Sequence, residues 1–228
     1  MNRFSLCALA VVGAAGLLAA ASPAQALSLQ EIIDNGTPIV AGDKIFSNFT
    51  YLSTTLPANQ IAVNFVDSSA VQFGANWNSA YGGGTMSSVI GYTVSVSPGV
   101  DNVITGAGLD FAGHVIIGDA RATVGETLFD DANSKNYGLQ VYYDGEGGLA
   151  DNLSDSTSVD PGVTSLRVIK SIDVSANGQA FGAVNFVANT FTQTPGGGEN
   201  PPVIPEPASL ALLPLAIVGL ALRKRLAR

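Results

Sequence analysis

The sequence has little of the chemistry that small secreted domains use for cross-linking or for holding transition metals. It contains one cysteine, one histidine and one tryptophan among 228 residues. The cysteine, Cys7, lies in the first apolar run, so no thiol follows Ala26. A disulfide-rich scaffold and a His/Cys zinc site are therefore excluded for the rest of the chain.

Basic residues are also scarce. Between Leu27 and Asn200 there are five basic and 17 acidic residues, a net charge of −12. The basic ones are Lys44, Arg121, Lys135, Arg167 and Lys170. Nucleic-acid binding needs clustered Lys and Arg to neutralise phosphates, so we expect no nucleic-acid partner.

The single histidine limits catalysis. A Ser-His-Asp triad would have to use His114, which begins an apolar run, and no Gly-x-Ser-x-Gly elbow accompanies it. We therefore expect a strand histidine, no catalytic residues and a protein that is not an enzyme. Paired carboxylates for glycoside hydrolysis stay open, because such pairs are distant in sequence.

The first 26 residues have the three parts of a secretory signal peptide. Arg3 precedes an apolar run from 4 to 21, and Ala24-Gln25-Ala26 supplies the small-x-small exit. We predict recognition by signal peptidase at Ala24 and Ala26 and cleavage after Ala26. Cys7 does not follow that cut, so a lipoprotein is not expected.

Residues 27–193 are predicted to form an all-β domain. Ile90, Tyr92, Val94 and Val96 alternate with small or polar residues, which is typical of a strand with one solvated face. Leu166, Val168 and Ile172 follow the same period. Gly- and Asn-rich turns separate the runs, which indicates an antiparallel β-sandwich of jelly-roll-like type. Leu29–Asp34 alone is predicted to be helical.

Such alternation, together with the turn residues between the runs, predicts eight strands. They are Lys44–Tyr51, Gln60–Val66, Ala70–Trp77, Ser88–Ser97, His114–Val124, Gly138–Asp144, Val163–Val174 and Gln179–Thr192.

The C-terminal part is a linker followed by a membrane segment. Residues 194–204 are rich in Gly and Pro and predict a spacer. Pro205-Glu206-Pro207 opens the segment 205–228, and an apolar stretch from 208 to 222 then predicts a transmembrane helix of roughly 22 Å. Arg223, Lys224 and Arg225 form a stop-transfer cluster that keeps the end of the chain cytoplasmic.

This order of motif, apolar helix and basic end resembles the PEP-CTERM sorting domain of Gram-negative bacteria. The resemblance covers 203–228 and implies processing by exosortase, a membrane transpeptidase or protease of cysteine type. It implies recognition at Pro205-Glu206-Pro207, transient residence of the precursor in the inner membrane, and delivery to the cell surface or extracellular matrix. Such proteins are linked to extracellular polysaccharide and biofilm. The stretch 42–51, GDKIFSNFTY, also resembles a β-domain found in many proteins with this tail.

Two kinds of binding site are conceivable from residue types, one for calcium and one for sugars. Asp144, Glu146, Asp151 and Asp155 lie in one loop and are calcium candidates, although the loop fails the EF-hand pattern. Asp130 and Asp131 with Asn133 form a second candidate of this kind. The aromatic residues that could stack on sugar rings, or simply pack in the core, are Trp77, Tyr81, Tyr92, Tyr142 and Tyr143.

Three hypotheses for function follow, and none of them requires a cofactor. The first is a surface-sorted structural protein of the extracellular matrix, associated with exopolysaccharide. The second is a lectin-like β-sandwich that binds carbohydrate or calcium. The third is a secreted hydrolase.

Overall fold

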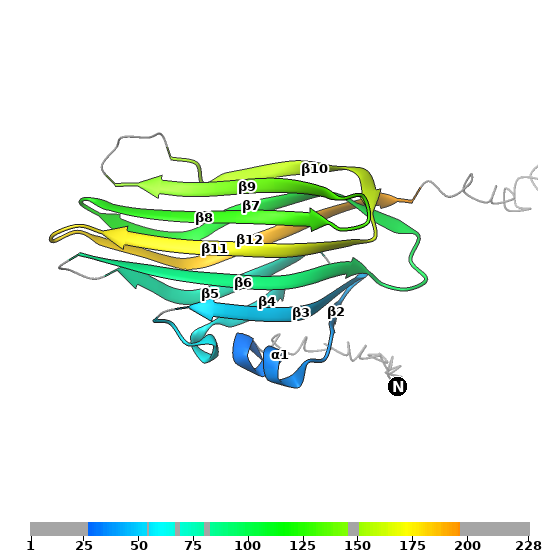
Figure 1. Ribbon diagram of the computed structural model, residues 1–228, viewed down its shortest axis with the longest axis horizontal. Coiled ribbons are helices and arrows are strands. Elements are labelled where there is room, and N and C mark those ends of the chain that lie inside the picture. The colour runs from blue at the N-terminus through cyan, green and yellow to red at the C-terminus, as the bar shows by residue number, and fades with distance from the viewer. Residues whose placement is uncertain (1–26, 54, 67–68, 80–82, 146–150, 197–228) are drawn as a thin grey trace, which may run out of the picture.

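The computed structural model describes residues 27–196, except 54, 67–68, 80–82 and 146–150. Two antiparallel six-stranded sheets pack face to face (Figure 1). Sheet A contains, in spatial order, β1 (Leu27–Ser28), β4 (Ala62–Val66), β5 (Ala70–Ser79), β12 (Phe181–Pro195), β7 (Asn102–Ile117) and β10 (Ser154–Val163). Sheet B contains β2 (Ile39–Ala41), β3 (Lys44–Ser53), β6 (Gly84–Val96), β11 (Ser165–Ala176), β8 (Ala120–Asp130) and β9 (Lys135–Asp144). The predicted β-sandwich is confirmed.

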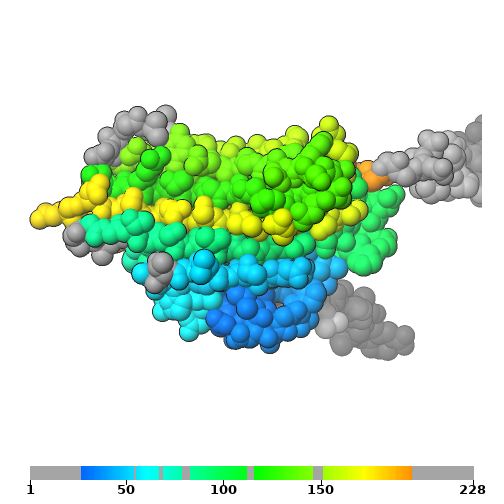
Figure 2. All heavy atoms as spheres, viewed as in Figure 1, coloured from blue at the N-terminus to red at the C-terminus, as the bar shows by residue number. Residues whose placement is uncertain are grey.

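The predicted helical segment is α1 (Leu29–Asn35). Ser28 caps it by accepting a hydrogen bond from the Glu31 backbone, while the Glu31 side chain accepts one from the Ser28 backbone. This reciprocal capping box satisfies N–H groups that the first turn leaves unpaired. Gly36 ends the helix with a φ of 60°, a left-handed conformation that glycine adopts at little cost. The helix packs beside β3 and the short 3₁₀ turn η1 (Ala58–Gln60), at one edge of the sandwich (Figures 1 and 2).

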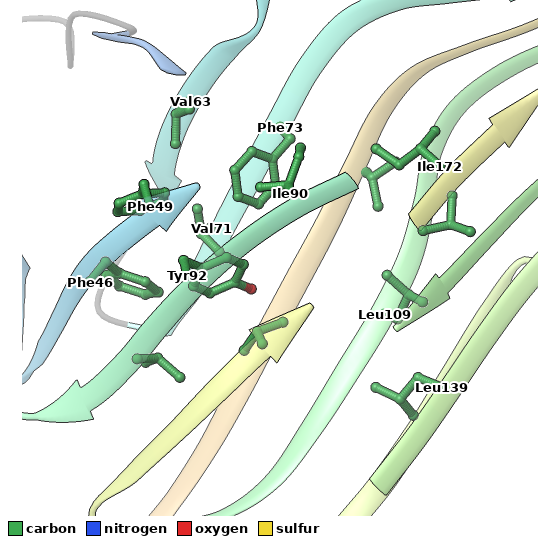
Figure 3. Packing of buried hydrophobic residues seen from close by; sticks show 14 of the residues in the cluster. Phe46, Phe49, Val63, Val71, Phe73, Ile90, Tyr92, Leu109, Leu139 and Ile172 are labelled. Carbon is green, nitrogen blue, oxygen red and sulfur yellow. The ribbon is translucent and has the colours of Figure 1, made fainter. Parts of the chain in front are cut away.

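The core lies between the two sheets and has an aromatic centre. The Tyr92 ring lies between 5.6 and 6.5 Å from those of Phe49, Phe73, Phe46 and Phe191 (Figure 3). Offset and tilted ring pairs at such separations add to the free energy of area burial. The residues predicted to face the core do so: Ile90, Tyr92, Val94, Leu166, Val168 and Ile172 are buried, and Val96 packs against them.

The strands depart most from the expected set at β7 and β10, and the short strands β1 and β2 are additional to that set. The predicted strand His114–Val124 is in fact the end of β7, a turn, and the start of β8. Gly118 makes this turn with a φ of 69°. Strand β10 was not expected, because its Ser- and Asp-rich sequence lacks an apolar alternation and its Asp160-Pro161-Gly162 resembles a turn. It pairs through its backbone at the edge of sheet A.

The ends of the chain lie outside the described residues, and with them the predicted signal peptide, sorting motif and transmembrane helix. In the part of the chain that the structure describes, no helix combines the length and apolar character needed to cross a membrane. The predicted linker begins at 194, but β12 continues through Thr194 and Pro195, which pair with Val103 and Asn102.

Candidate functional site

A hollow of about 310 Å³, the sheet B hollow, opens on the outer face of sheet B near the β8–β9 turn. Four strands of sheet B contribute to it, together with the connection from β10 to β11. Its main lining side chains are Asn48, Thr93, Phe129, Asp131, Ser165 and Arg167.

Strand register brings three of these side chains into one row. Thr93 on β6 lies directly opposite Arg167 on β11, and Arg167 lies directly opposite Phe129 on β8. Directly opposed residues of antiparallel strands project from the same face, about 5 Å apart. The row continues to Ser47 on β3 and to Asn136 on β9. Across five strands it is about 19 Å long, since neighbouring strands lie about 4.8 Å apart.

Arg167 is held from two sides. Its guanidinium carbon lies 4.0 Å from the centroid of the Phe129 ring, a cation–π contact. Its Nη2 and Nε donate to the two carboxylate oxygens of Asp131, at 3.1 and 3.3 Å. This fork geometry uses two of the five guanidinium N–H groups. Arg167 is thus oriented while it retains donors for another molecule.

Asn48 enters the hollow through an irregularity in β3. The register between β3 and β6 shifts between Ser47 and Thr50, and Asn48 there has a φ of 54°. Asparagine tolerates this left-handed conformation better than most residues. Its Nδ2 donates to Thr93 Oγ1 at 3.3 Å. The bulge therefore places an amide beside the Arg167 row instead of continuing the alternation of the strand.

The hollow combines an ion pair, an amide and hydroxyl groups with an aromatic ring. The charges of Arg167 and Asp131 cancel, so the pair has no net charge. The side chains of Arg167 and Asp131 are 43% and 68% exposed. An exposed ion pair of this kind contributes little to folding stability. Its planar polar groups are suited to hydrogen bonding with vicinal hydroxyls, and the accessible part of Phe129 can pack against C–H groups.

The surface next to the Arg167 row is low at Gly138. The neighbouring row contains Gly91, Ile169, Thr127 and Gly138. A Cβ built on Gly138 would meet no atom within 4 Å, so open space lies above that strand. The Thr50 side chain covers Gly91, so the low part of this surface lies at the Gly138 end of the row.

A second shallow groove, of about 280 Å³, lies on sheet A along β7, β10 and β12. Hydroxyl groups of Thr105, Ser156, Thr157, Thr190 and Thr192 line it. Its lining residues include neither an aromatic ring nor a charged group. The sheet B hollow offers the more varied chemistry and is the better candidate site.

Two of the calcium candidates accept hydrogen bonds from the backbone of β9. Asp151 Oδ1 accepts a hydrogen bond from the Asp144 backbone at 3.3 Å, and Asp155 Oδ2 accepts one from the Gln140 backbone at 2.8 Å. These carboxylates attach the loop to β9. Glu146 lies outside the described residues. Within the described ranges, no three or more His, Cys, Asp or Glu side chains gather as metal ligands would, and calcium binding stays a prediction.

The other carboxylate candidates belong to the β8–β9 turn. Asp130 is buried and accepts hydrogen bonds from the backbone and the side chain of Asn133, at 3.0 and 2.8 Å. It thereby closes the turn, in the manner of an Asx turn. Asp131 instead points to Arg167 and belongs to the sheet B hollow.

Of the aromatic residues that could stack on sugars or pack in the core, two belong to the core. Trp77 and Tyr92 are 0% and 1% exposed and belong to the core. Tyr81 lies outside the described residues. Tyr142 and Tyr143 are partly exposed, and the Arg121 guanidinium lies 5.9 Å from the Tyr142 ring centroid. His114 is a strand residue as expected, opposite Val184 of β12.

Sequence reasoning missed Phe129 and Arg167 as site residues. Arg167 was expected on the solvated face of its strand, since it alternates with Leu166 and Val168. Phe129 carries a corresponding signal, as a ring out of phase with the apolar Leu128. Their meeting depends on the pairing of β11 with β8, which is not encoded locally.

The chain matches no family model and no curated protein. Three solved structures are similar to it at 10% identity. TmCBM61 in complex with β-1,4-galactotriose has a TM-score of 0.30, with 62% of this chain and 88% of that chain covered. The enzymatically active domain of bacteriophage CBA120 tailspike protein 4 has a TM-score of 0.26, with 65% and 19% covered.

The third structure belongs to a study of promiscuous carbohydrate-binding modules from the β-sandwich superfamily. Its TM-score is 0.25, with 71% of this chain and 60% of that chain covered. At such identities and TM-scores, none of the three likenesses identifies a function for this chain.

Proposed function

We propose that this chain is an exported, non-enzymatic β-sandwich protein that binds carbohydrate through the sheet B hollow. The observation that carries the proposal is the position of Arg167, stacked on Phe129 and hydrogen bonded to Asp131 on an exposed sheet face. Sugars present vicinal hydroxyls beside patches of C–H, and a site that binds them needs planar polar groups next to an apolar surface. Arg167, Asp131 and Phe129 supply that combination.

Charge favours a neutral glycan. The region from Leu27 to Asn200 carries a net charge of −12, which repels polyanions at long range. The guanidinium of Arg167 is already paired with a carboxylate, so the hollow presents no unbalanced positive charge to an anionic sugar. A neutral polysaccharide meets no such repulsion.

Sorting completes the proposal. The signal peptide, the Pro205-Glu206-Pro207 motif and the basic end would deliver the domain to the cell surface or matrix, with exosortase as the processing enzyme. An extracellular polysaccharide is a partner available in that location. A protein that only occupies space in the matrix is the alternative, and it differs by having no specific glycan affinity.

A glycan array tests the proposal, followed by calorimetry of the best neutral oligosaccharide. The full chain is compared with Phe129→Ala and Arg167→Ala. We expect each variant to weaken binding about tenfold or more, the equivalent of one or two lost hydrogen bonds or of ring contact. Phe186→Ala is the control for Phe129, because Phe186 is a phenylalanine accessible to solvent, 41% exposed, that lies on β12 of sheet A.

Arg121→Ala is the control for Arg167, since it removes an arginine above a different aromatic ring of sheet B. Measurements with calcium and with a chelator show whether a metal contributes. An array that binds no glycan would favour the structural matrix protein. Binding that survives both variants of the hollow would place the glycan elsewhere and contradict the proposal.

A further inference from the structure

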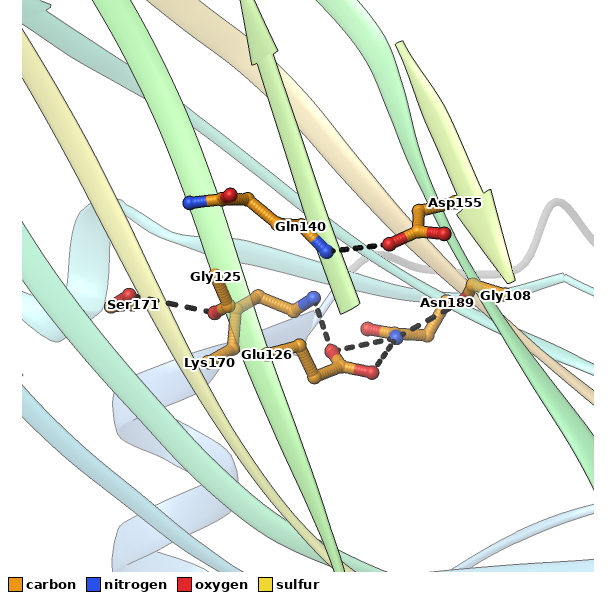
Figure 4. Close-up of polar contacts among 8 residues, drawn as sticks. All are labelled: Gly108, Gly125, Glu126, Gln140, Asp155, Lys170, Ser171 and Asn189. Carbon is orange, nitrogen blue, oxygen red and sulfur yellow. Dashed lines mark hydrogen bonds and ion pairs between the residues drawn. The ribbon is translucent and has the colours of Figure 1, made fainter. Parts of the chain in front are cut away.

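A lysine and a glutamate face each other inside the core. Lys170 on β11 lies opposite Glu126 on β8, and both side chains are 0% exposed. Lys170 Nζ donates to Glu126 Oε2 at 2.6 Å (Figure 4). Lys170 is in phase with the buried Val168 and Ile172, so the strand period itself directs it inward.

An asparagine of the opposite sheet meets this pair. Asn189 on β12 donates through Nδ2 to both carboxylate oxygens of Glu126, each at 2.7 Å. Its Nδ2 also lies 3.3 Å from the carbonyl oxygen of Gly108. Its own Oδ1 is buried without a hydrogen-bond partner. The amine and the amide therefore share one carboxylate as their common neighbour (Figure 4).

The surroundings disfavour charge. Val187 and Phe191 flank Asn189 on the same strand and are as buried as it is. Removing an ion pair from water is expensive even when its geometry is good. Burial lowers the pKa of Lys170, and the charge and hydrogen bond of Glu126 oppose that change only in part. Burial, and then the charge of Glu126, raise the pKa of Tyr92, so this neighbouring phenol stays neutral.

We propose that Lys170 and Asn189 form an intramolecular isopeptide bond, with Glu126 as the proton carrier. The reaction is the aminolysis of a side-chain amide. The bond between Lys170 Nζ and Asn189 Cγ forms, the bond between Cγ and Nδ2 breaks, and ammonia leaves. Oxidation states do not change, and no co-reactant is required.

The proton balance runs through Glu126. Its carboxylate takes a proton from the Lys170 ammonium, which leaves a neutral amine and a neutral acid, the forms that a dry interior favours. Rotation of the Asn189 amide presents the unpartnered Oδ1 to the acid, which polarises the carbonyl for attack by the amine. Glu126 then gives its proton to the leaving nitrogen and takes the proton that Nζ releases, and ends as a neutral carboxylic acid.

The bond would join the two sheets, because Lys170 belongs to sheet B and Asn189 to sheet A. The chain after Ala26 has no cysteine with which to make a disulfide. A cross-link between lysine and asparagine would join the two sheets covalently in an exported protein, and unlike a disulfide it is not cleaved by reducing agents. This inference does not depend on carbohydrate binding.

Peptide mass spectrometry of the purified full chain tests the inference. A protease that cleaves before aspartate cuts the chain at Asp173, between the two residues, and should give a branched peptide that joins the segments around Lys170 and Asn189, lighter than their sum by about 17 Da, the mass of ammonia. Trypsin should not cut after Lys170, because acylation removes its charge. Glu126→Gln, which keeps the shape of the side chain but cannot carry the proton, should restore both linear peptides and lower the thermal midpoint of unfolding.

Asn177→Ala is the control variant. Asn177 precedes Gly178, and such a pair can also lose ammonia by closing a succinimide, without forming a branch. The branched peptide should persist in Asn177→Ala. If folded wild-type protein, verified by circular dichroism, is cut after Lys170 and yields only linear peptides, the inference is wrong and the three residues form a non-covalent network. That result is decisive whether or not the Glu126 variant folds.

Discussion

The indole Nε1 of Trp77 donates a hydrogen bond to the Oγ of Ser88, 3.2 Å away and wholly within the core. Ser88 Oγ in turn lies 3.1 Å from both Tyr51 OH and Ser53 Oγ. A hydroxyl thus satisfies the polar end of the single tryptophan where water is excluded. The buried serine therefore lets the polar N–H of Trp77 be accommodated in the core.

Ser88→Val should therefore destabilise the fold. The substitution leaves the Trp77 N–H without its acceptor, and an unsatisfied buried donor costs about 1–3 kcal/mol. Urea unfolding followed by tryptophan fluorescence measures the effect. Ser158→Val, on the exposed edge strand β10, should change the free energy of unfolding by less than about 0.5 kcal/mol. Equal stability of the two variants would contradict the role assigned to Ser88.

Asp43 should stabilise the fold near neutral pH, and this contribution to the free energy of unfolding should be lost in acid. Burial acts to raise the pKa of Asp43, but the hydrogen bond from Lys44 and its charge outweigh burial, and the pKa is lowered. Lys44 Nζ lies 3.0 Å from Asp43 Oδ1, and Asn102 Nδ2 lies 3.3 Å from Oδ2. Since the folded pKa is below the unfolded one, the contribution is present above the ordinary value of 3.8 and is lost as pH falls through the folded pKa.

Thermal unfolding from pH 7 to pH 2 checks this expectation. The stability difference between wild type and Asp43→Asn should be largest near neutral pH and should narrow below about pH 4. Asp173→Asn, on the outer face of β11, controls for general loss of negative charge. A difference that does not vary with pH would show that Asp43 acts through packing and not through its charge.

The sorting motif gives a third prediction. Replacing Pro205, Glu206 and Pro207 with alanine should leave export intact but retain the full-length precursor in the inner membrane. The two prolines favour an extended backbone that a protease can bind, and alanines would let the following helix extend through the motif. Fractionation with immunoblotting, together with sequencing of the amino terminus at the predicted Leu27, measures both steps.

Replacing Pro201 and Pro202 with alanine is the matched control, since it removes two linker prolines outside the motif. That variant should be processed like wild type. A shortened, extracellular form of the triple-alanine protein would instead favour an ordinary membrane anchor.

Much of the sandwich could be predicted from the sequence, because strand alternation is a local property. Ile90, Tyr92 and Val94 project to one face whatever their strand pairs with, so their burial followed from the period alone. The predictions failed where that signal is weak. Gly118 turns β7 into β8 within a segment whose alternation resembles one strand, and in the edge strand β10 the buried apolar residues are limited to Val159 and Val163.

The sites depended on information that no local pattern holds. Arg167 and Phe129 are 38 positions apart in number, and they meet because β11 pairs with β8 in one particular register. Lys170 and Glu126 sit in phase with apolar neighbours, so the sequence by itself determined that both turn inward. That they face each other was decided by strand pairing, and that Asn189 reaches them was decided by the packing of the two sheets. Side-chain direction follows from the geometry of single residues, whereas the partner of a side chain follows from which sheet arrangement buries the most apolar surface.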